Sequence, residues 1–431
     1  MSPLTPFLIP AINRSFDVEI TLPGSKSIAL RQLAMAALAQ GTTHLTGIPE
    51  CDDTQAMIDC LIELGVSVES DGETTVVRGP MDFGHSTLNL NARMSGASTR
   101  LLIGMAALRK GTTHIDGHSS LRARSNQPLF DVIQKHGCTV ESSSGGLPAT
   151  ITGPIEASPS LMIDGSLSSQ YITALLLIAP MTCPESGQMI QISGDLVSKP
   201  YLDITLNEMS KCGVKAHWHD KRTIFVEQSH YQNGQRTVEG DATAATYFSA
   251  LATLHGGRVT LTNIDQTTHQ GDYEFCTVME ALGANVERQG HTRIVGPSQL
   301  TPLAQIDMQT MPDAALTLIA MSPLLSGTNT ITGLQSLHHK ECDRLECPAK
   351  ELRAMGIAVS TTVDTITVEA KDPAAFKPHT LTTYHDHRMA MAFAPLGLKV
   401  PININNAEVV SKSYPDFWDD LKKIDFDQKI I

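Results

Sequence analysis

Residues 41–70 read GTTHLTGIPECDDTQAMIDCLIELGVSVES, and residues 111–142 read GTTHIDGHSSLRARSNQPLFDVIQKHGCTVES. Each stretch contains a glycine, a short β-type run, a polar link, an amphipathic helical pattern, a second glycine and another β-type run. The two copies start 70 residues apart, which indicates an internal structural repeat. Because strand and helix patterns alternate within each copy, the repeated unit is of βαβ type and the fold class is α/β.

The same pattern recurs along the rest of the chain. Copies begin at Gly187, Gly256 and Gly327, and a truncated copy closes the chain over residues 400–424. Before each copy lies a helical stretch with a polar start and an almost entirely apolar body, which predicts a buried helix. The starts are rich in Ser, Asp and Thr, which helix N-caps prefer. These helices are expected within residues 24–40, 95–108, 166–180, 240–254, 311–325 and 385–398.

The size and charge of the chain limit its function. With 431 residues it is too long for one ordinary core, so its six units are expected to form two domains of three. Aromatic residues make up only 5%, which predicts aliphatic cores. The net charge of −13 argues against nucleic-acid binding, because phosphate backbones select basic surfaces.

The cysteines and the apolar runs indicate the compartment. The eight cysteines form neither a CxxC pair nor a zinc-ligand spacing, so we expect free thiols in a reducing cytoplasm and no metal site. The N-terminal residues lack a basic signal-peptide start. The longest apolar run, residues 172–181, is far shorter than the ~20 residues that a membrane span needs. We therefore expect a cytoplasmic protein without membrane contact.

Basic residues occupy equivalent places in successive copies of this acidic chain. A single Lys or Arg is usually a solvated surface charge. Recurrence at the starts of buried helices, where backbone N–H groups also favour anions, predicts instead an anion-binding cleft between the two halves. The helix starts carry Lys26, Arg31, Arg100 and Arg388, and the links carry Arg122, Arg124, Lys199, Lys340, Arg344 and Lys412.

A hydroxyl cluster precedes the third helix. Capping needs one serine, whereas this start offers Ser166, Ser168, Ser169 and Gln170, which suits phosphate oxygens. The run GSKS at residues 24–27 is not a Walker A loop, and no dinucleotide-binding glycine pattern is present. A nucleotide cofactor therefore has no support.

Two carboxylates lie among the cations. Asp313 suits a helix N-terminus, and Glu341 suits a helical ion pair with Lys340 or Arg344. Neighbouring cations lower a carboxyl pKa and burial raises it, so a proton-transfer role is compatible with either residue. For the pairs Asp52-Asp53 and Asp386-His387, the sequence is equally compatible with a helix cap and with a functional group of the site.

Eight segments follow one another in the order LPGSKSI, DGSLSSQYITALL, GDLVSKPYLDITL, VEGDATAATYF, MPDAA, KECDRL, DHRMAMAFA and KSYPDF. With these segments the chain resembles the family of 5-enolpyruvylshikimate-3-phosphate (EPSP) synthase, or 3-phosphoshikimate 1-carboxyvinyltransferase, over essentially its whole length. The resemblance implies two inside-out α/β barrel domains, each of three βαβαββ units, with the active site in the interdomain cleft. The lower domain would comprise residues 1–22 and 240–431, and the upper domain residues 23–239.

The resemblance also implies a reaction. The family transfers the enolpyruvyl (carboxyvinyl) group of phosphoenolpyruvate to the 5-hydroxyl of shikimate 3-phosphate and releases phosphate, in the shikimate pathway to chorismate and aromatic amino acids. The family needs neither a metal nor an organic cofactor, so we expect none. The expected partners are the two small substrates, with no nucleic acid or membrane, and we expect a monomer.

The residue roles are carried over by motif. The implied catalytic residues are Lys26, Asp313 and Glu341. The implied ligands of shikimate 3-phosphate are Lys26, Ser27, Arg31, Ser168, Ser169, Gln170, Ser198, Tyr201, Asp313 and Lys340. The implied ligands of phosphoenolpyruvate are Lys26, Gly96, Arg100, Arg124, Gln170, Arg344, Arg388 and Lys412.

The chain departs from the family pattern at several positions. Met94 and Ala97 stand where Asn and Thr are usual, Ser125 where Pro is usual, and Ser336 where Asn is common. Loss of Asn at 94 and 336 can each remove a hydrogen bond to a substrate. Because Gly96 is retained, glyphosate is predicted to compete with phosphoenolpyruvate.

Two other functions stay open at this point. A sister transferase acts on UDP-N-acetylglucosamine, but it carries a Cys in the loop that is GHSSLRARSNQP here, at residues 117–128, and this loop has none. A diverged, non-catalytic anion-binding paralogue is the other alternative. The presence of Lys26, Asp313, Glu341 and Lys412 argues against it.

Overall fold

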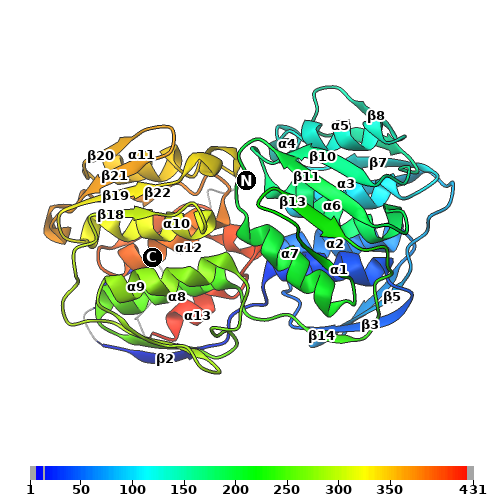
Figure 1. The fold of residues 1–431 in the computed structure, drawn as a ribbon. Helices are drawn as coiled ribbons and strands as arrows, with labels where there is room; N and C mark the ends of the chain where they lie inside the picture. The colour runs from blue at the N-terminus through cyan, green and yellow to red at the C-terminus, as the bar shows by residue number, and fades with distance from the viewer. Residues whose placement is uncertain (1–5, 13–14, 425–431) are drawn as a thin grey trace. The chain divides into compact units, whose positions relative to one another are not determined.

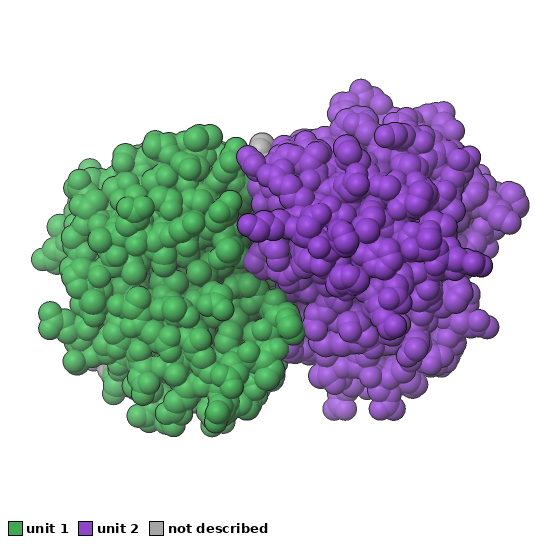
Figure 2. All heavy atoms as spheres, in the orientation of Figure 1, with its two compact units in different colours: residues 1–23, 240–431 green, residues 24–239 purple. Residues whose placement is uncertain are grey.

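The computed structural model describes residues 6–12 and 15–424, and the chain divides into two compact units (Figures 1 and 2). Unit 1 contains the residues up to Pro23 and those from Gly240 on, and unit 2 contains Gly24–Glu239. The first division lies one residue later than the sequence predicts. Pro23 belongs to unit 1, where its carbonyl oxygen accepts a hydrogen bond of 2.9 Å from the Asp241 backbone N–H.

Unit 2 contains three four-stranded sheets of one design. In the order in which the strands lie in each sheet, the first pairs parallel with the second, and the third lies antiparallel between the second and the fourth. The strand orders are β14 (Gln235–Thr237), β3 (Gly41–Thr46), β5 (Thr74–Gly79), β4 (Ser67–Ser70); β6 (Leu88–Asn91), β7 (Thr112–Asp116), β9 (Ala149–Thr152), β8 (Thr139–Ser142); and β10 (Ser160–Asp164), β11 (Gln188–Ser193), β13 (Thr223–Val226), β12 (Ala216–Trp218).

The helices of unit 2 are of two kinds, as their sequences predict. Three are buried almost all round and pack against one another: α1 (Lys26–Leu38), α3 (Gly96–Ala107) and α6 (Ser169–Thr182). The others bury one face, as amphipathic helices do. These are α2 (Asp52–Glu63), α5 (Gln127–Lys135) and α7 (Pro200–Lys211), with the short α4 (Ser119–Arg122) in the second link.

Unit 1 repeats this design, with one incomplete sheet. β2 (Asp17–Ile20), drawn in blue, pairs parallel with β15 (Arg258–Leu261), so the N-terminal strand joins the C-terminal half (Figure 1). The truncated sixth copy has no hairpin of its own; β1 (Phe7–Ile9) pairs antiparallel with β23 (Ile402–Ile404) instead. The remaining strands are β16 (Asn285–Glu287), β17 (Thr292–Val295), β18 (Gln305–Asp307), β19 (Thr328–Thr332), β20 (Val359–Thr361), β21 (Ile366–Glu369) and β22 (Thr380–Leu381).

Three buried helices also form the centre of unit 1. They are α8 (Ala242–His255), α10 (Pro312–Met321) and α12 (His387–Gly397), and every residue of α10 and α12 is buried. The outer helices and short 3-10 turns are η1 (Gly271–Glu274), α9 (Phe275–Ala281), η2 (Ser322–Leu324), η3 (Gln335–His339), α11 (Glu346–Ala354), η4 (Pro373–Ala375), η5 (Ala407–Lys412) and α13 (Phe417–Lys422).

Each unit therefore has its own core, with helices inside and sheets outside, and the predicted α/β fold of six repeated units is confirmed. The cores are largely aliphatic, with one aromatic cluster in unit 1 around Phe417. Over the described ranges, none of the helices has the length and apolar character that crossing a membrane demands.

Candidate active site

In unit 1 the N-terminal halves of the three buried helices lie together. The Arg388 guanidinium at the start of α12 donates to the Tyr247 hydroxyl of α8 over 3.3 Å and to Asp313 Oδ2 of α10 over 3.0 Å. Thr246 and Thr317 join α8 to α10 through their hydroxyls over 2.9 Å. Because each helix start carries unpaired backbone N–H groups and the positive end of a dipole, this is a region of positive potential.

Asp313 accepts hydrogen bonds from three cations. Its Oδ1 receives Lys340 Nζ over 2.9 Å and Arg344 Nη1 over 3.0 Å, and its Oδ2 receives Arg388. Burial by itself would raise the pKa of Asp313, but Lys340, Arg388 and Arg344 together hold that pKa well below its usual value. The carboxylate is therefore ionised at neutral pH and able to accept a proton.

Arg344 connects the carboxylates of the cluster, and only 1% of it is exposed. Its Nε donates to Asp386 Oδ2 over 2.7 Å, and its Nη2 donates to Glu341 Oε2 over 2.7 Å. Burial lowers the pKa of Arg344, but the charges of Asp386, Glu341 and Asp313 outweigh it and raise the pKa. Lys412 Nζ lies 3.2 Å from Glu341 Oε1. One network thus joins the six predicted site residues of this unit, which are Asp313, Lys340, Glu341, Arg344, Arg388 and Lys412.

Two further carboxylates belong to this region. Asp386 caps α12 by accepting from the Arg388 backbone N–H over 3.0 Å and also pairs with Arg344, so it is both a cap and a site group. Asp272 of η1 accepts from the Thr243 hydroxyl and was missed in the sequence, although its link, HQGDYE, occupies the place where other copies carry site residues. Burial, reinforced by the charge of Asp313, raises the pKa of Asp272 to about 6.

In unit 2, Arg31 braces the buried helices. Its Nε donates to Thr205 Oγ1 over 2.8 Å, and its terminal nitrogens donate to the carbonyls of Ser27 over 2.6 Å and Tyr201 over 3.0 Å. A longer contact of 3.4 Å reaches Thr173 on α6. Burial lowers the pKa of Arg31 to about 10, which leaves it charged at neutral pH. All of these hydrogen-bond acceptors are uncharged oxygens.

A second arrangement of arginines surrounds the start of α3. Arg100 donates to the carbonyls of Gly96 over 2.9 Å and Ser125 over 3.1 Å, and the Tyr171 hydroxyl donates to the same Ser125 carbonyl over 2.7 Å. A Cβ at Gly96 would lie 2.4 Å from Arg124 Nη1, so the guanidinium of Arg124 rests against the glycine. Among the described residues the Arg124 side chain forms no hydrogen bond or ion pair. Sequence reasoning missed Tyr171, which fixes the loop that carries Arg124.

The remaining predicted residues of unit 2 lie at the starts of α1, α6 and α7. Lys26, the first residue of α1, forms an ion pair of 2.9 Å with Asp53 of α2. Ser168 caps α6 through the Gln170 backbone N–H, and within the described chain Gln170 Oε1 is buried with no partner. Ser198, directly before the N-cap of α7, has a φ of +55°. Positive φ in a residue other than glycine is a strained geometry that clusters at functional sites. Ser27, Ser169 and Tyr201 occupy the first turns of α1, α6 and α7.

The comparisons with known proteins agree over nearly the whole chain. The sequence model of EPSP synthase (3-phosphoshikimate 1-carboxyvinyltransferase) matches residues 11–421. The chain belongs to this family. It is 35% identical over 415 residues to the 3-phosphoshikimate 1-carboxyvinyltransferase of Photobacterium profundum, covering 94% of this chain and 96% of the relative. The corresponding transferase of Aliivibrio salmonicida is 37% identical over 418 residues, with coverage of 95% and 97%.

Solved structures give the same result for the fold. The EPSP synthase of Acinetobacter baumannii superimposes with a TM-score of 0.78 at 25% identity, covering 97% of this chain and 98% of that one. The enolpyruvyl transferase NikO of Streptomyces tendae reaches a TM-score of 0.76 at 18% identity, with 98% of both chains covered. This second likeness concerns the fold alone. Membership of the EPSP synthase family makes the chain a transferase of the shikimate pathway, and neither alternative function receives support.

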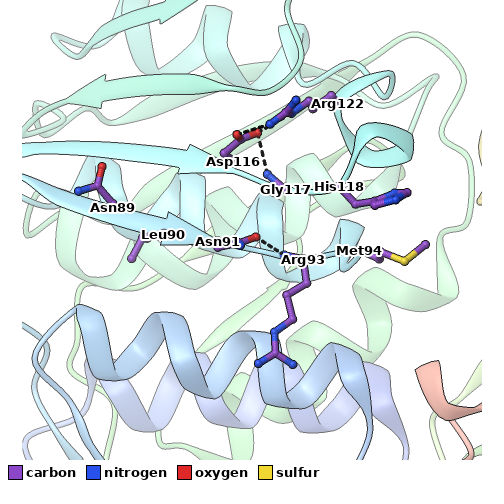
Figure 3. Close-up of a pocket in the computed structure, with 9 residues that line it drawn as sticks. All are labelled: Asn89, Leu90, Asn91, Arg93, Met94, Asp116, Gly117, His118 and Arg122. Atoms are coloured by element: carbon purple, nitrogen blue, oxygen red, sulfur yellow. Dashed lines mark hydrogen bonds and ion pairs between the residues drawn. The ribbon is translucent and has the colours of Figure 1, made fainter.

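The departures from the EPSP synthase pattern have different consequences. Ser125 contributes its backbone carbonyl to Arg100 and Tyr171, so the site contact does not depend on which side chain stands there. Met94 lines a pocket of about 520 Å³ beside the start of α3 (Figure 3). In that pocket Arg122 pairs with Asp116, and the Arg93 side chain forms an ion pair with Asp59. The pocket is lined by Asn89, Leu90, Asn91, Arg93, Met94, Asp116, Gly117, His118 and Arg122. Arg122 is one of the recurring cations, but none of the residues with an implied substrate or catalytic role lines this pocket.

Two of the recurring cations are engaged on the surface. Arg122 donates to Asp116 over 2.9 and 2.6 Å, and Lys199 donates to Asp203 over 2.9 Å while lying over the Trp218 ring. Both pairs are exposed, so they contribute little to stability. Position within a repeat is therefore not sufficient to identify the site cations. A cation at an equivalent position can instead form an exposed ion pair with a neighbouring carboxylate.

Proposed function

We propose that this chain transfers the carboxyvinyl group of phosphoenolpyruvate to the 5-hydroxyl of shikimate 3-phosphate and releases phosphate. The observation that carries the proposal is the network around Arg344, in which Asp313 and Glu341 lie among four cations. Family membership over residues 11–421 supports the same reaction. Two highly anionic substrates need such cations to be held together against their mutual repulsion.

The geometry suggests how protons move in this reaction. Addition requires a proton on the methylene carbon of phosphoenolpyruvate and removal of the proton from the attacking hydroxyl. Elimination then expels phosphate and removes a proton from the new methyl group. Asp313, ionised at neutral pH, suits the base that takes the hydroxyl proton, while Glu341, between Arg344 and Lys412, suits the exchange at carbon with Lys26 assisting.

The binding residues follow the predicted division of roles. Arg124, Arg344, Arg388 and Lys412 are proposed to hold phosphoenolpyruvate, with Gly96, Arg100, Gln170 and Lys26 beside them. Shikimate 3-phosphate is proposed to bind Lys26, Ser27, Arg31, Ser168, Ser169, Gln170, Ser198, Tyr201, Asp313 and Lys340. Gln170 Oε1, which is buried and has no partner among the described residues, supports the proposal because it can accept a hydrogen bond from a ligand. Within the part of the chain that the structure describes, the Arg124 guanidinium forms no hydrogen bond or ion pair, which also supports it.

A phosphate-release assay with both substrates tests the proposal. The unmodified chain should release phosphate with shikimate 3-phosphate and not with UDP-N-acetylglucosamine. Asp313→Asn and Glu341→Gln should each lower kcat by about 10²–10⁴-fold. Asp419→Asn, which removes an exposed carboxylate of the same unit, is the matched control and should leave kcat unchanged. Binding of both substrates without phosphate release would favour the non-catalytic paralogue and refute the proposal.

The finer predictions are proposed with the same reaction. Glyphosate should compete with phosphoenolpyruvate, because Gly96 leaves room for Arg124 at the start of α3. An inhibition curve that stays flat up to millimolar glyphosate would contradict this. A cytoplasmic location is supported by the eight free cysteines, and a monomer with no cofactor remains the expected form.

A further inference from the structure

Two consecutive residues before α12 have left-handed backbone conformations. Tyr384 and His385 have φ values of +54° and +57°, and Asp386, the N-cap of α12, follows directly. Outside glycine, a positive φ costs free energy, and such residues persist only where surrounding contacts hold them. The segment Thr382–His385, here called the strained turn, therefore needs contacts elsewhere in the unit that keep it in place.

Glu351 on α11 supplies these contacts. Its Oε1 accepts from the Tyr384 hydroxyl over 2.6 Å, and its Oε2 accepts from the Thr382 backbone N–H over 3.1 Å. His379 Nε2, two residues before Leu381, lies 2.6 Å from the same Oε2. Glu351 is only 3% exposed. One side chain thus fixes the strained turn at two points and also holds His379, directly before the strand that leads into it.

Tyr384 is the donor in its contact with Glu351. Burial raises the pKa of Tyr384, and the hydrogen bond to Glu351 raises it further, so the phenol keeps its proton and donates. The Lys350 ammonium lies 5.8 Å from the centre of the Tyr384 ring. Within the described residues Glu351 forms no hydrogen bond or ion pair with Arg344, Arg388 or Asp313, so an effect of Glu351 on those residues must pass through the strained turn.

The strained turn leads directly to the residues that face the substrates. Asp386 receives Arg344 Nε over 2.7 Å and Nη2 over 3.1 Å, and it receives the backbone N–H of Arg388 over 3.0 Å. Arg388 in turn donates to Asp313. A shift of the turn would move the cap, and with it the guanidinium of Arg388 and the partner of Arg344. A displacement of about 1 Å at such groups can cost about 10²-fold in rate.

We propose that Glu351 is a positioning residue for phosphoenolpyruvate binding: it holds the strained turn, and through Asp386 it sets the places of Arg344 and Arg388. The inference rests on the proposed function, because it takes these two arginines as the ligands of phosphoenolpyruvate. Lys340, one of the proposed ligands of shikimate 3-phosphate, lies on the link before α11. Within the described residues it forms no hydrogen bond with the strained turn. Loss of Glu351 should therefore affect the two substrates unequally.

Steady-state kinetics of Glu351→Gln provide the first test. The substitution keeps the shape and removes the charge, and it presents an NH₂ group to donors that need an acceptor. The KM for phosphoenolpyruvate should rise at least tenfold while the KM for shikimate 3-phosphate stays within about twofold. Tyr384→Phe, which deletes one donor, should move the same KM less. Glu346→Gln removes the charge of a solvent-accessible carboxylate on the same helix and should change neither KM.

A rescue experiment separates positioning from simple stabilisation. After Gly, Asn and Asp are the residues that most readily visit the left-handed region, because their short polar side chains can hydrogen-bond locally, and the His385 side chain is exposed. In the Glu351→Gln background, His385→Asn should therefore recover part of the affinity for phosphoenolpyruvate. A lower melting temperature with both KM values unchanged would overturn the inference, as would an equal rise in both KM values or no rescue.

The direct variant Arg388→Lys distinguishes this failure from failure of the proposed function. If Arg388→Lys raises the KM for phosphoenolpyruvate and Glu351→Gln does not, only the positioning role is wrong. If Arg388→Lys leaves that KM unchanged, the assignment of Arg388 is wrong and the positioning role falls with it. If the unmodified chain releases no phosphate, the proposed function fails first.

Discussion

The two units each bury an arginine at the centre of their predicted site residues, but they surround it differently. Arg344 in unit 1 is 1% exposed and bonds to the carboxylates of Asp313, Glu341 and Asp386. Arg31 in unit 2 is 5% exposed and bonds to hydroxyl and carbonyl oxygens. The hydrogen bonds of Arg344 thus go to charged acceptors, whereas those of Arg31 go to neutral dipoles, with the Glu208 carboxylate as a further nearby charge.

This difference indicates a division of labour. The hydrogen-bond acceptors of Arg31 are uncharged, although Glu208 adds a nearby negative charge and Lys26 of the same unit is paired with Asp53. In unit 1 an arriving anion must share or exchange the cations that now hold carboxylates. The compensation in unit 1 keeps Asp313 ionised, which a base needs. We infer that unit 2 supplies most of the proposed ligands of shikimate 3-phosphate, whereas unit 1 supplies the proton-transfer carboxylates and three of the four cations proposed to hold phosphoenolpyruvate.

The largest effect is expected when each of the two arginines is replaced in a separate variant. Arg344→Met leaves the buried carboxylates of Asp313 and Asp386 and the partly buried Glu341 without their shared partner and should cost about 3–5 kcal/mol in the free energy of unfolding. Arg31→Met leaves only neutral acceptors and should cost about 1–3 kcal/mol. Urea denaturation of both variants checks the order. Equal losses would show that the carboxylates around Arg344 are not the deciding feature.

The pH dependence of stability probes the carboxylate side of the comparison. The pKa of Asp272 is raised to about 6 by burial, so the folded state favours the protonated form. Stability from this group is complete below its unfolded pKa near 4 and is lost as pH rises through about 6, by about 3 kcal/mol at most. Asp272→Asn should remove this loss. Its stability relative to the unmodified chain should rise between pH 4 and pH 7, whereas parallel pH profiles would count against the assignment.

Gly96→Ala examines Arg124 of unit 2. The new Cβ would stand 2.4 Å from Arg124 Nη1 and 2.9 Å from Arg100 Nη1, so both guanidinium groups must move. Arg124 has no hydrogen bond among the described residues to lose, whereas Arg100 donates to two carbonyls, so the free energy of unfolding should fall by about 1 kcal/mol. The KM for phosphoenolpyruvate should rise about 10–100-fold. An unchanged KM would show that Arg124 does not bind phosphoenolpyruvate.

The smallest expected effect concerns Gln170. Its buried Oε1 has no partner among the described residues, so Gln170→Leu should remove an unsatisfied acceptor and stabilise the ligand-free chain by about 1 kcal/mol. The same change should raise the KM for at least one substrate severalfold. Thermal unfolding and steady-state kinetics check both parts. A destabilised variant with normal KM values would make Gln170 a structural residue.

Much of the fold could be predicted from the sequence, because hydrophobic periodicity records which helices are buried. Every residue of α10 and α12 is buried, as their apolar bodies predict. The charged residues of the unit 1 network were identified individually, but their pairing was not, because Asp313, Glu341 and Asp386 meet only through long-range folding. Tyr171, Asp272 and Glu351 were missed, since each acts through a contact with a distant segment.

The division of the chain after Pro23 and Glu239 has a consequence for biosynthesis. Unit 2 is one continuous stretch and can fold on the ribosome as soon as β14 has emerged to complete its first sheet. The earlier strands β2 and β1 must wait for β15 at Arg258–Leu261 and β23 at Ile402–Ile404. Nascent chains stalled before residue 258 should therefore carry a protease-resistant unit 2 and a cleavable leading segment, and that segment would be the natural target for a chaperone.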